Sequence, residues 1–534
     1  MNSLFKGFTE ITGSRLILLV STFLIAFGNV TFFSNIVGVY PVNLKNSLFL
    51  LSLVIVFGGV TVLFLSFICH KYTIKLVLII VLLVSSLASY FMDSYSLIID
   101  EAMIRNVIST DTAESLDLIS LKMILYIALL GVLPSVFVYR IKVTDRGLRK
   151  NLLSRMKLIL LTLVSVVLVI VILGDFYASF FREHKPLRYY SNPTFYIHSV
   201  LRYINAATEV HAQALKMIED DVKAPAVDPH RELMIFVVGE TARADRFSLN
   251  GYQRETNPLL KQKHVVSFPN FWACGTSTAV SVPCMFSIFT HDEFSHDKAL
   301  ETENLLDVLK RSGDNVLWLD NNSDSKGVAL RVPHQNYRLP ENNPNCDIEC
   351  RDEGMLAHIQ EYIDEHDQGD IFIVLHQMGS HGPAYYKRYT SAFEKFTPSC
   401  HTNQLEDCSK EQIDNTYDNG ILYTDYFLAN VIDLLERNND KFEPAMFYVS
   451  DHGESLGEHG LYLHGMPYFI APEEQLHVPA IMWFGKNYHG VDEAFLEKIK
   501  SIKYSHDNIF HTVLDFMEVD TSIYNKSLDI LSVD

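Results

Sequence analysis

The pattern of apolar and polar residues changes near residue 175. Before that point, five apolar runs each approach the roughly 20 residues that a helix needs to cross the hydrocarbon core of a bilayer. The runs lie near Leu16–Phe33, Leu48–Cys69, Lys75–Phe91, Met123–Tyr139 and Leu158–Leu173. Because four more runs follow the first one, an uncleaved anchor explains it better than a signal peptide does. We therefore predict five transmembrane spans; buried helices of a large soluble core are the alternative.

Charged residues in the loops predict the orientation of these spans, since Lys and Arg accumulate on the cytoplasmic side of a membrane. The loop between the second and third runs is basic, and so is the loop from Arg140 to Lys157 between the fourth and fifth. The loop between the third and fourth runs is acidic, with residues such as Asp93 and Asp117. An odd number of spans with the N-terminus inside then places everything after Leu173 outside the cytoplasm.

The chain after the last apolar run divides into a connection and a second domain. Residues 176–230 are mixed and polar, with a predicted interfacial helix over Thr194–Met217 and a linker over Lys223–Pro229. We therefore place a membrane domain at 1–175, the connection at 176–230 and an extracytoplasmic domain at 231–534.

Strand-like and helix-like runs alternate in the extracytoplasmic domain. Such alternation predicts a mostly parallel sheet with helices on both faces, which is an α/β fold. The predicted strands are Leu233–Val238, Val316–Leu319, Ile371–Leu375, Ala445–Val449 and His477–Phe484. The predicted helices are Thr302–Arg311, Glu353–Glu365 and Gln412–Arg437.

Charge and cysteine content fit two environments. Residues 1–175 carry 14 Lys and Arg against 9 Asp and Glu, a net charge of +5, and the remainder carries 30 against 54, a net charge of −24. So acidic a domain argues against a nucleic-acid partner.

Six of the seven cysteines form close pairs: Cys274 and Cys284, Cys346 and Cys350, Cys400 and Cys408. Nearest-neighbour disulfides in an oxidising compartment are the simplest explanation, and a zinc–thiolate site is the rival. The seventh, Cys69, lies in an apolar run.

Residues of types that can bind metals follow three of the predicted strands, in each case after the carboxyl end. Glu240 follows the first strand, His376 and His381 follow the Ile371 run, and Asp451 with His452 follow the Ala445 run. The carboxyl ends of parallel strands meet at one edge of a sheet, where ligands bind in open α/β folds. Carboxylates and imidazoles together suit a divalent ion such as zinc. A surface loop with solvated Asp and His is the alternative.

The segment between Cys274 and Cys284 is rich in hydroxyls, and it has the composition of a helix start. The amide hydrogens at a helix N-terminus can bind phosphate oxygens. A Ser or Thr here could attack phosphorus if a bound metal favoured its alkoxide form. Alternatively these hydroxyls only cap the helix.

A polar stripe occurs in the acidic loop that is predicted to face outward. Asn106, Thr110 and Glu114 recur every four residues and would share one face of a helix. The stripe could hold a lipid head group at the membrane surface, or it could simply be solvated.

Three motifs resemble those of the membrane-anchored phosphoethanolamine transferases that modify lipid A, which include the mobile colistin-resistance enzymes. This family belongs to the alkaline phosphatase and sulfatase superfamily, and the resemblance covers essentially the whole chain. The motifs are Val238–Arg243, Cys274–Cys284 and Ser450–Ser455 with His464–Pro467. The resemblance implies five transmembrane helices followed by a periplasmic domain with an alkaline phosphatase-like α/β/α sandwich.

Residue by residue, the resemblance assigns roles to positions of this chain. It implies that Thr278 is the nucleophile and also a zinc ligand, together with Glu240, Asp451 and His452. His381 and His464 fall near a second metal, which is bound less constantly, and near the substrate phosphate. Ser323 and Lys326 look like phosphate-contacting residues, and Asn106, Thr110 and Glu114 look like head-group contacts. Some relatives carry two extra cysteines around this lysine; here Ser325 and Ala329 leave that segment unbridged.

The resemblance implies a zinc-dependent enzyme of the bacterial inner membrane, associated with the lipids of that membrane. Thr278 would take phosphoethanolamine from phosphatidylethanolamine and pass it to lipid A, with His381 or His464 moving protons. We expect a monomer. One rival is a phosphoglycerol transferase that uses manganese and acts on another envelope polymer. The other is a catalytically silent receptor that binds lipid.

Overall fold

The computed structural model describes residues 10–532 except 110–111, 183, 210–214, 224–229, 489–490 and 492. The chain forms two compact units. The first contains the described residues up to Ile104 together with Ile119–Ile204, and the second contains Arg105–Leu118 together with the described residues from Asn205 onward. The domain limits 1–175, 176–230 and 231–534 stay a prediction, but the assignment of Arg105–Leu118 to the second unit was not foreseen from the sequence.

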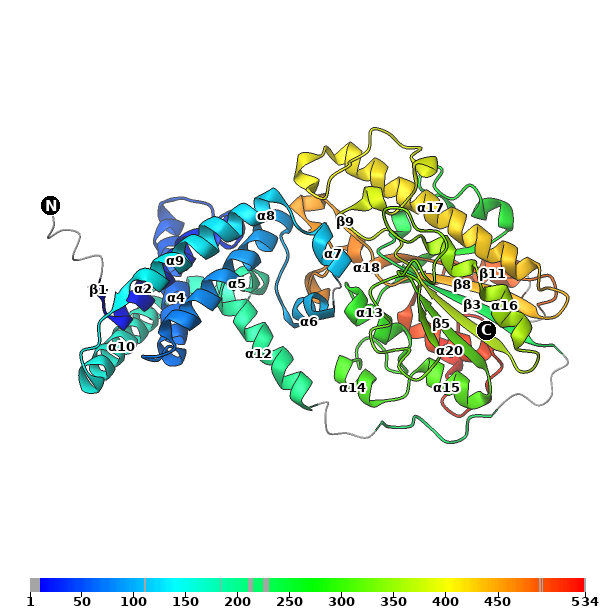
Figure 1. Ribbon diagram of the computed structural model, residues 1–534, viewed down its shortest axis with the longest axis horizontal. Helices are drawn as coiled ribbons and strands as arrows, with labels where there is room; N and C mark the ends of the chain where they lie inside the picture. Colours follow the sequence, from blue (N-terminus) through cyan, green and yellow to red (C-terminus); the bar gives the residue numbers. More distant parts are fainter. Residues whose placement is uncertain are drawn as a thin grey trace. The chain divides into compact units, whose positions relative to one another are not determined.

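The first unit consists of long apolar helices (Figure 1). Among the described residues, four helical stretches are long and apolar enough to cross a membrane, and a helix pair bent by 57° makes a fifth if it counts as one span. The four stretches are α4 (Leu44–Ile68), α5 (Ile74–Tyr95), Leu121–Arg140, which comprises α8, a π-helical turn and α9, and α10 (Leu148–Ile172). The bent pair is α2 (Gly13–Phe27) and α3 (Val30–Val39). The predicted number of spans is therefore compatible with the structure.

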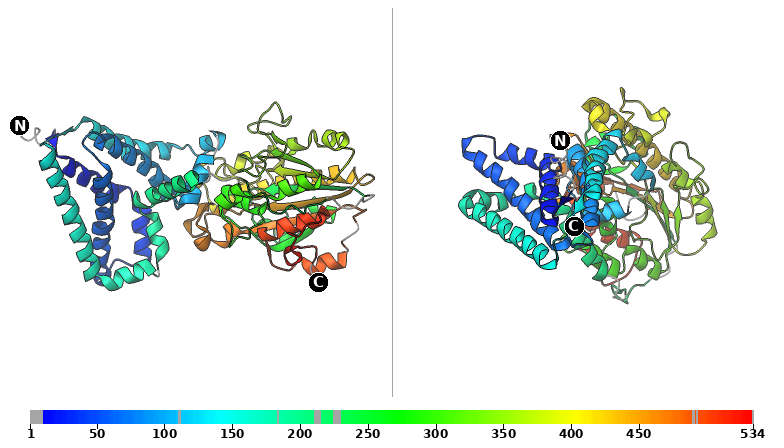
Figure 2. Two further views of the ribbon diagram at one scale, coloured as in Figure 1. Left: turned by 90° about the horizontal axis from the view of Figure 1, so that it is seen from below. Right: turned by 60° about the vertical axis from the view of Figure 1, so that its left-hand side comes forward.

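Polar contacts inside the first unit satisfy the backbone at the bend between α2 and α3. Asn192 Nδ2 donates to the carbonyl of Gly28 at 3.1 Å and to the carbonyl of Ser85 at 2.9 Å. The carbonyl of Asn192 accepts a hydrogen bond of 2.7 Å from Asn29 Nδ2. Because a helix break exposes backbone groups that lipid cannot satisfy, buried amide side chains of this kind make the bend tolerable. Helices α4 and α10 lie side by side in this unit (Figure 2).

The connection between the units is partly as predicted. It contains α11 (Gly174–Arg182), a 3-10 helix (Lys185–Tyr190) and α12 (Thr194–Glu209). The helix predicted over Thr194–Met217 was too long, since Lys216 pairs with Thr302 in a β-bridge. Most of the predicted linker lies outside the described residues.

A mixed eight-stranded sheet forms the centre of the second unit, in the order β12-β4-β11-β8-β3-β7-β5-β6. The strands are β3 (Glu232–Gly239), β4 (Val266–Trp272), β5 (Asn315–Asp320), β6 (His334–Asn336), β7 (Ile371–His376), β8 (Glu443–Ser450), β11 (His477–Phe484) and β12 (Tyr504–Ser505). All residues of β3, β7 and β8 are buried, which explains their nearly continuous apolar sequences. The predicted strands are confirmed to within two residues at each end.

Register brings the carboxyl ends of the three central strands to one edge of the sheet. Val238 of β3 pairs in parallel with His376 of β7 on one side and with Val449 of β8 on the other. The residues that follow these three positions therefore emerge next to each other. This edge is where the metal-binding residues were predicted to meet.

Helices cover both faces of the sheet, as predicted (Figure 1). On one face, α13 (Thr278–Met285), α15 (Leu305–Ser312) and α20 (Ile509–Phe516) pack on an apolar core that includes Phe236, Trp318 and Phe447. The long helix α17 (Lys410–Glu436) contacts β8 from the other face. A capping box between Ser409 and Gln412 starts α17 two residues before the predicted position. This arrangement is the predicted α/β/α sandwich.

Three parts of the sheet differ from the expectation or were missed. β11 runs antiparallel to both β8 and β4, so the sheet is parallel only in its other pairs. β4 was not predicted, because Pro269 and Asn270 interrupt its apolar pattern. The helix predicted over Glu353–Glu365 is split into a 3-10 helix (Asp352–Leu356) and α16 (Ile359–Glu365).

Candidate metal centre and active site

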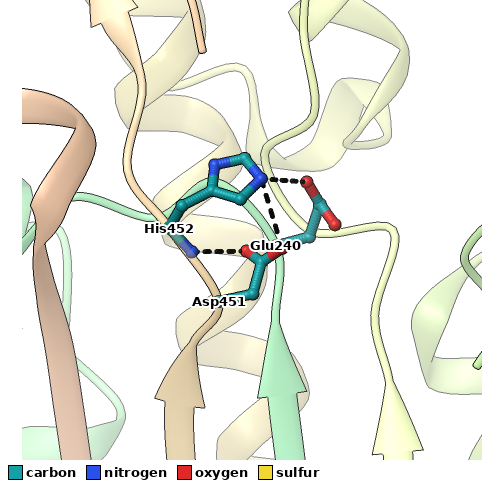
Figure 3. Close-up of side chains that lie close together, drawn as sticks. All are labelled: Glu240, Asp451 and His452. Carbon is teal, nitrogen blue, oxygen red and sulfur yellow. Dashed lines mark hydrogen bonds and ion pairs between the residues drawn. The ribbon is translucent and has the colours of Figure 1, made fainter. Parts of the chain in front are cut away.

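Glu240, Asp451 and His452 lie together at the carboxyl edge of the sheet (Figure 3). Glu240 follows β3, and the other two residues follow β8. His452 Nε2 lies 3.2 Å from Asp451 Oδ2 and 3.5 Å from Glu240 Oε1. All three side chains are fully buried. Within the described part of the chain, this is the one group of three acidic, His or Cys residues whose ligand atoms lie close enough to share a metal ion.

Thr278 adds a hydroxyl to this group from α13, a helix that covers one face of the sheet. It is the first residue of α13, where backbone amides have no partner within the helix. Its Oγ1 lies 3.2 Å from Glu240 Oε2 and 3.4 Å from His452 Nε2. The Thr278 side chain is almost fully buried. The nucleophile that the resemblance indicated is therefore in contact with two of the three predicted ligands.

The separations of these atoms fit a tetrahedral zinc ion. Zinc binds oxygen and nitrogen at roughly 2.0–2.1 Å, so ligand atoms at the corners of a tetrahedron lie about 3.3 Å apart. With Glu240 Oε1 as its ligand atom, four of the six separations run from 3.2 to 3.5 Å, and the ligand atoms of Glu240, Asp451 and His452 all lie within 4.8 Å of one another. In addition, Asp451 Oδ2 is buried and has no hydrogen-bond partner in the part of the chain that the structure describes. Three oxygens and one imidazole nitrogen in this arrangement fit zinc, and none of the described residues donates a hydrogen bond to Asp451 Oδ2.

Hydrogen bonds direct the correct atom of each ligand toward the centre. Asp451 Oδ1 accepts from the backbone amides of Thr241 at 3.2 Å and of His452 at 2.7 Å, which leaves Oδ2 for the metal. His452 Nδ1 donates to the carbonyl of Gly453 at 2.9 Å, so the unprotonated Nε2 faces the centre. A side chain at Gly453 would collide with the backbone of Glu474, so this bend requires glycine.

Burial also sets the charge of these groups. It raises the pKa of the Asp451 carboxyl to about 6 and lowers the pKa of His452 well below its ordinary value. The imidazole is therefore neutral, as a metal ligand must be. A bound divalent cation would reverse the effect on Asp451, because it stabilises the ionised carboxylate.

Asn322 contacts a candidate metal ligand, and its role was not predicted from the sequence. Its Nδ2 donates to Glu240 Oε2 and to the carbonyl of Gln377, both at 2.7 Å. It follows β5, at the same sheet edge as the predicted ligands. Its position just after a predicted strand is the sequence feature that could have identified it as a neighbour of the ligands.

Ser323 and Lys326 lie beside this asparagine. Lys326 Nζ donates to Ser323 Oγ at 2.6 Å. Ser323 Oγ in turn donates to Asn322 Oδ1 at 3.0 Å, and Asn322 bonds to the ligand Glu240. The two predicted phosphate contacts are thus connected to the metal centre.

His464 and His381 flank the centre. The ring of His464 lies 4.3 Å from that of His452 and 5.5 Å from that of His381, measured between centroids. His464 Nδ1 donates to Glu454 Oε2 at 2.9 Å, and Glu454 Oε1 accepts from the Tyr385 hydroxyl at 2.8 Å. This pairing leaves His464 Nε2 as a proton acceptor. Glu454 belongs to the motif Ser450–Ser455, but its contact with His464 could not be foreseen from spacing.

His376 is not part of the ligand group. Its Nδ1 lies 3.2 Å from Asp320 Oδ2, and both residues are buried. The sequence placed it correctly at the end of β7 but did not separate it from the ligands. Its pairing with Asp320 explains its position inside the sheet.

A cavity of about 300 Å³ adjoins the centre. Its lining includes Asn322, Ser323 and His381 as well as the disulfide loop Cys346–Cys350. Other lining residues include Asp117, Arg338, Met378 and Arg388. The cavity is therefore large enough for a small polar group next to the candidate catalytic residues.

The predicted head-group residues are only partly described. Asn106 lies in α6 (Glu101–Ser109) and Glu114 in α7 (Thr112–Asp117), while Thr110 lies outside the described residues. Their common helix face stays a prediction.

All three predicted disulfides are confirmed. Cys274 bonds to Cys284, Cys346 to Cys350 and Cys400 to Cys408, and Cys69 is a buried free cysteine. The first bond joins the two ends of the segment that carries Thr278. The zinc–thiolate alternative is therefore wrong for these six residues.

Comparisons with known proteins agree with this geometry. Residues 57–208 match the family "Phosphoethanolamine transferase EptA/EptB", and residues 232–519 match the sulfatase family. Phosphatidylethanolamine transferase Mcr-1 of Escherichia coli is 42% identical over 94% of both chains. Phosphoethanolamine transferase EptA of Salmonella typhimurium is 40% identical over 96% of both chains.

A solved structure extends the similarity to the whole fold. The integral membrane protein lipooligosaccharide phosphoethanolamine transferase A (EptA) from Neisseria meningitidis has a TM-score of 0.94 to this chain at 36% identity. The match covers 98% of this chain and 99% of the other. It confirms the predicted localisation, a multi-pass protein of the bacterial inner membrane with a periplasmic catalytic domain. The chain belongs to the phosphoethanolamine transferases, a family of membrane enzymes with an alkaline phosphatase-like catalytic domain.

Proposed function

We propose that this protein transfers phosphoethanolamine from phosphatidylethanolamine to lipid A through a covalent intermediate on Thr278. The observation that carries the proposal is the contact of Thr278 Oγ1 with Glu240 and His452 inside a buried group whose ligand atoms lie close enough to share a metal ion. A hydroxyl in that position can become a nucleophile, whereas a cap needs no metal ligands around it. The names of Mcr-1 and EptA support the donor and the transferred group.

Zinc is the proposed cofactor, held by Glu240, Thr278, Asp451 and His452. The bound ion would favour the alkoxide form of the threonine and offset the charge of the phosphate oxygens. One ion fits the described group, and a second ion would have to use His381 or His464. Manganese, the ion of the rival phosphoglycerol transferases, prefers oxygen ligands, so the imidazole in this group favours zinc.

The reaction divides into two transfers. In the first, Thr278 Oγ forms a bond to phosphorus, the bond from phosphorus to the diacylglycerol oxygen breaks, and the threonine proton passes to His381 or His464. His381 or His464 gives a proton to the departing diacylglycerol oxygen. In the second, an oxygen of lipid A bonds to phosphorus, the bond to Thr278 breaks, and the proton of the acceptor returns to Thr278 Oγ through the histidine. The basic Nε2 of His464, left by the bond to Glu454, is suited to accept the proton of the acceptor.

Ser323 and Lys326 would hold the phosphate during both transfers. The lysine ammonium contributes a compact positive charge, and Ser323 connects it to Asn322 beside Glu240. Phosphate oxygens bound between these residues and the amides at the start of α13 would place phosphorus next to Thr278.

The test is the mass of lipid A from cells that produce the protein. We expect lipid A to gain one phosphoethanolamine group with the wild type and nothing with Thr278→Ala. Thr276→Val is the matched control, because Thr276 Oγ1 donates to the carbonyl of Met466 and not to the ligands. Modified lipid A from the Thr278→Ala variant would contradict the proposal. A phosphoglycerol increment on another polymer would favour the first rival, and no modification by the wild type would favour the silent receptor.

A further inference from the structure

A short segment between two apolar helices belongs to the catalytic unit. Residues Arg105–Leu118 follow α5 in the chain and pack with the second unit. Their last helix, α7, ends at Asp117, and only residues 118–120 separate Asp117 from the candidate span Leu121–Arg140. The chain thus leaves a membrane helix, contributes to the catalytic unit and returns to the next membrane helix.

Asp117 anchors this segment through three contacts. Its Oδ1 forms an ion pair with Lys387 Nζ, and its Oδ2 lies 3.3 Å from Arg388 Nη2. Its backbone carbonyl accepts a hydrogen bond of 2.5 Å from Asn403 Nδ2. The Asp117 side chain is 13% exposed and that of Arg388 is 3% exposed. Lys387 is 29% exposed, so its pair with Asp117 is partly screened, whereas the contact with the buried Arg388 is screened less than that of a surface ion pair.

Arg388 also links Asp117 to the candidate catalytic residue His381. Arg388 Nε donates to the carbonyl of His381 at 2.7 Å, and Arg388 Nη1 bonds to Glu349 in the disulfide loop. One arginine therefore connects the segment from between the spans, the loop with His381 and the loop Cys346–Cys350. Asp117 and His381 also line the same cavity beside the metal centre.

We propose that Asp117 is a positioning residue that fixes the segment between the spans against the catalytic unit and so completes the cavity for a lipid donor. The inference rests on the proposed function, since it assumes that the cavity receives the head group of a bilayer lipid. A lipid has to enter from the membrane side, and Asp117 holds the part of the chain that joins this cavity wall to a span. A small soluble ester needs only the metal centre and Thr278.

Two substrates separate this role from a general effect on stability. The full-length protein in phosphatidylethanolamine vesicles should lose roughly tenfold or more in kcat/KM when Asp117→Asn is introduced, chiefly through KM. Hydrolysis of a water-soluble aryl ester of phosphoethanolamine should stay within about twofold of the wild type. Asp117→Glu should restore part of the lipid activity, because it keeps the charge.

Asp414→Asn is the matched control. Asp414 also pairs with an arginine and a lysine, Arg246 at 2.8 Å and Lys410 at 3.3 Å, and its side chain is 18% exposed. This variant should leave the ratio of the two activities unchanged. Lys387→Met combined with Asp117→Asn should cost less than the sum of the single changes, because both remove the same ion pair.

The outcomes are distinguishable. Loss of lipid activity alone in Asp117→Asn supports the inference. Unchanged lipid activity, or an equal loss on both substrates, overturns it while the proposed function stands. A wild type that acts on neither phosphatidylethanolamine nor the soluble ester overturns the proposed function and the inference with it.

Discussion

Replacement of Asn322 by Ala tests whether the chain itself orients the metal ligands. Asn322 is 5% exposed, and its Nδ2 is shared between Glu240 Oε2 and the carbonyl of Gln377, both at 2.7 Å. The change removes the side-chain amide that makes both hydrogen bonds, and it replaces none of the candidate metal ligands. Glu240 keeps its charge but loses the contact that fixes one of its oxygens.

The expected effect on metal affinity is moderate. Loss of a partner that orients a metal ligand typically costs about 10–100-fold in affinity, which equals about 1.4–2.7 kcal/mol. A hydrogen bond to a charged group contributes about 1.5–3 kcal/mol, which agrees with that range. The variant should therefore be inactive at limiting zinc and regain most activity at excess zinc.

The assay is a zinc titration against a chelator of known affinity. Asn438→Ala is a suitable control, because Asn438 is equally buried and bonds to Leu434 and Gln360, away from the centre. This control should lower stability and leave zinc affinity unchanged. An unchanged zinc affinity in Asn322→Ala would refute the reasoning.

Two further predictions concern pH and metal removal. Burial opposes the charge of Glu458, but the guanidinium of Arg243 holds the pKa of this carboxyl at about 2, below its usual 4.5. Because the carboxyl is partly exposed and so screened by solvent, ionised Glu458 stabilises the fold by about 2 kcal/mol at neutral pH. This contribution is lost as pH falls from about 4.5 to about 2. Glu458→Gln should be less stable than the wild type in urea at pH 7, and the gap should shrink below pH 4.5; a gap independent of pH would contradict this. Free zinc at about 100 times its dissociation constant should stabilise the protein by about 2.7 kcal/mol over the chelated form. Asp451→Asn should show no such shift in melting temperature; a shift equal to that of the wild type would exclude Asp451 as a ligand.

The sequence predicted that the candidate metal ligands would lie close together, because they follow strands. Glu240 and Asp451 come directly after apolar runs whose parallel pairing brings their ends together. The contacts of Asn322, Glu454 and Asp117 were not predictable in this way. They depend on side-chain directions and on packing between distant segments, which leave no periodic signal. Among strands, β4 was missed because its proline and its half-buried side chains weaken the apolar pattern.

Local features of the catalytic unit were predicted better than properties of the whole sheet. The apolar periodicity of α17 is a local pattern, so its start was predicted at Gln412, two residues after the observed start at Lys410. The direction of β11 is a property of the whole sheet, and its sequence does not distinguish parallel from antiparallel neighbours.

The position of Asp117 in the cavity wall matters for inhibitor discovery. A catalytic domain produced alone, from about residue 216 onward, would keep the metal ligands and all three disulfides but would lack this wall. Compounds selected on such a fragment would meet a more open cavity than the complete enzyme presents. Screens against the intact chain would therefore select molecules that contact Asp117. A screen on the fragment cannot find such molecules.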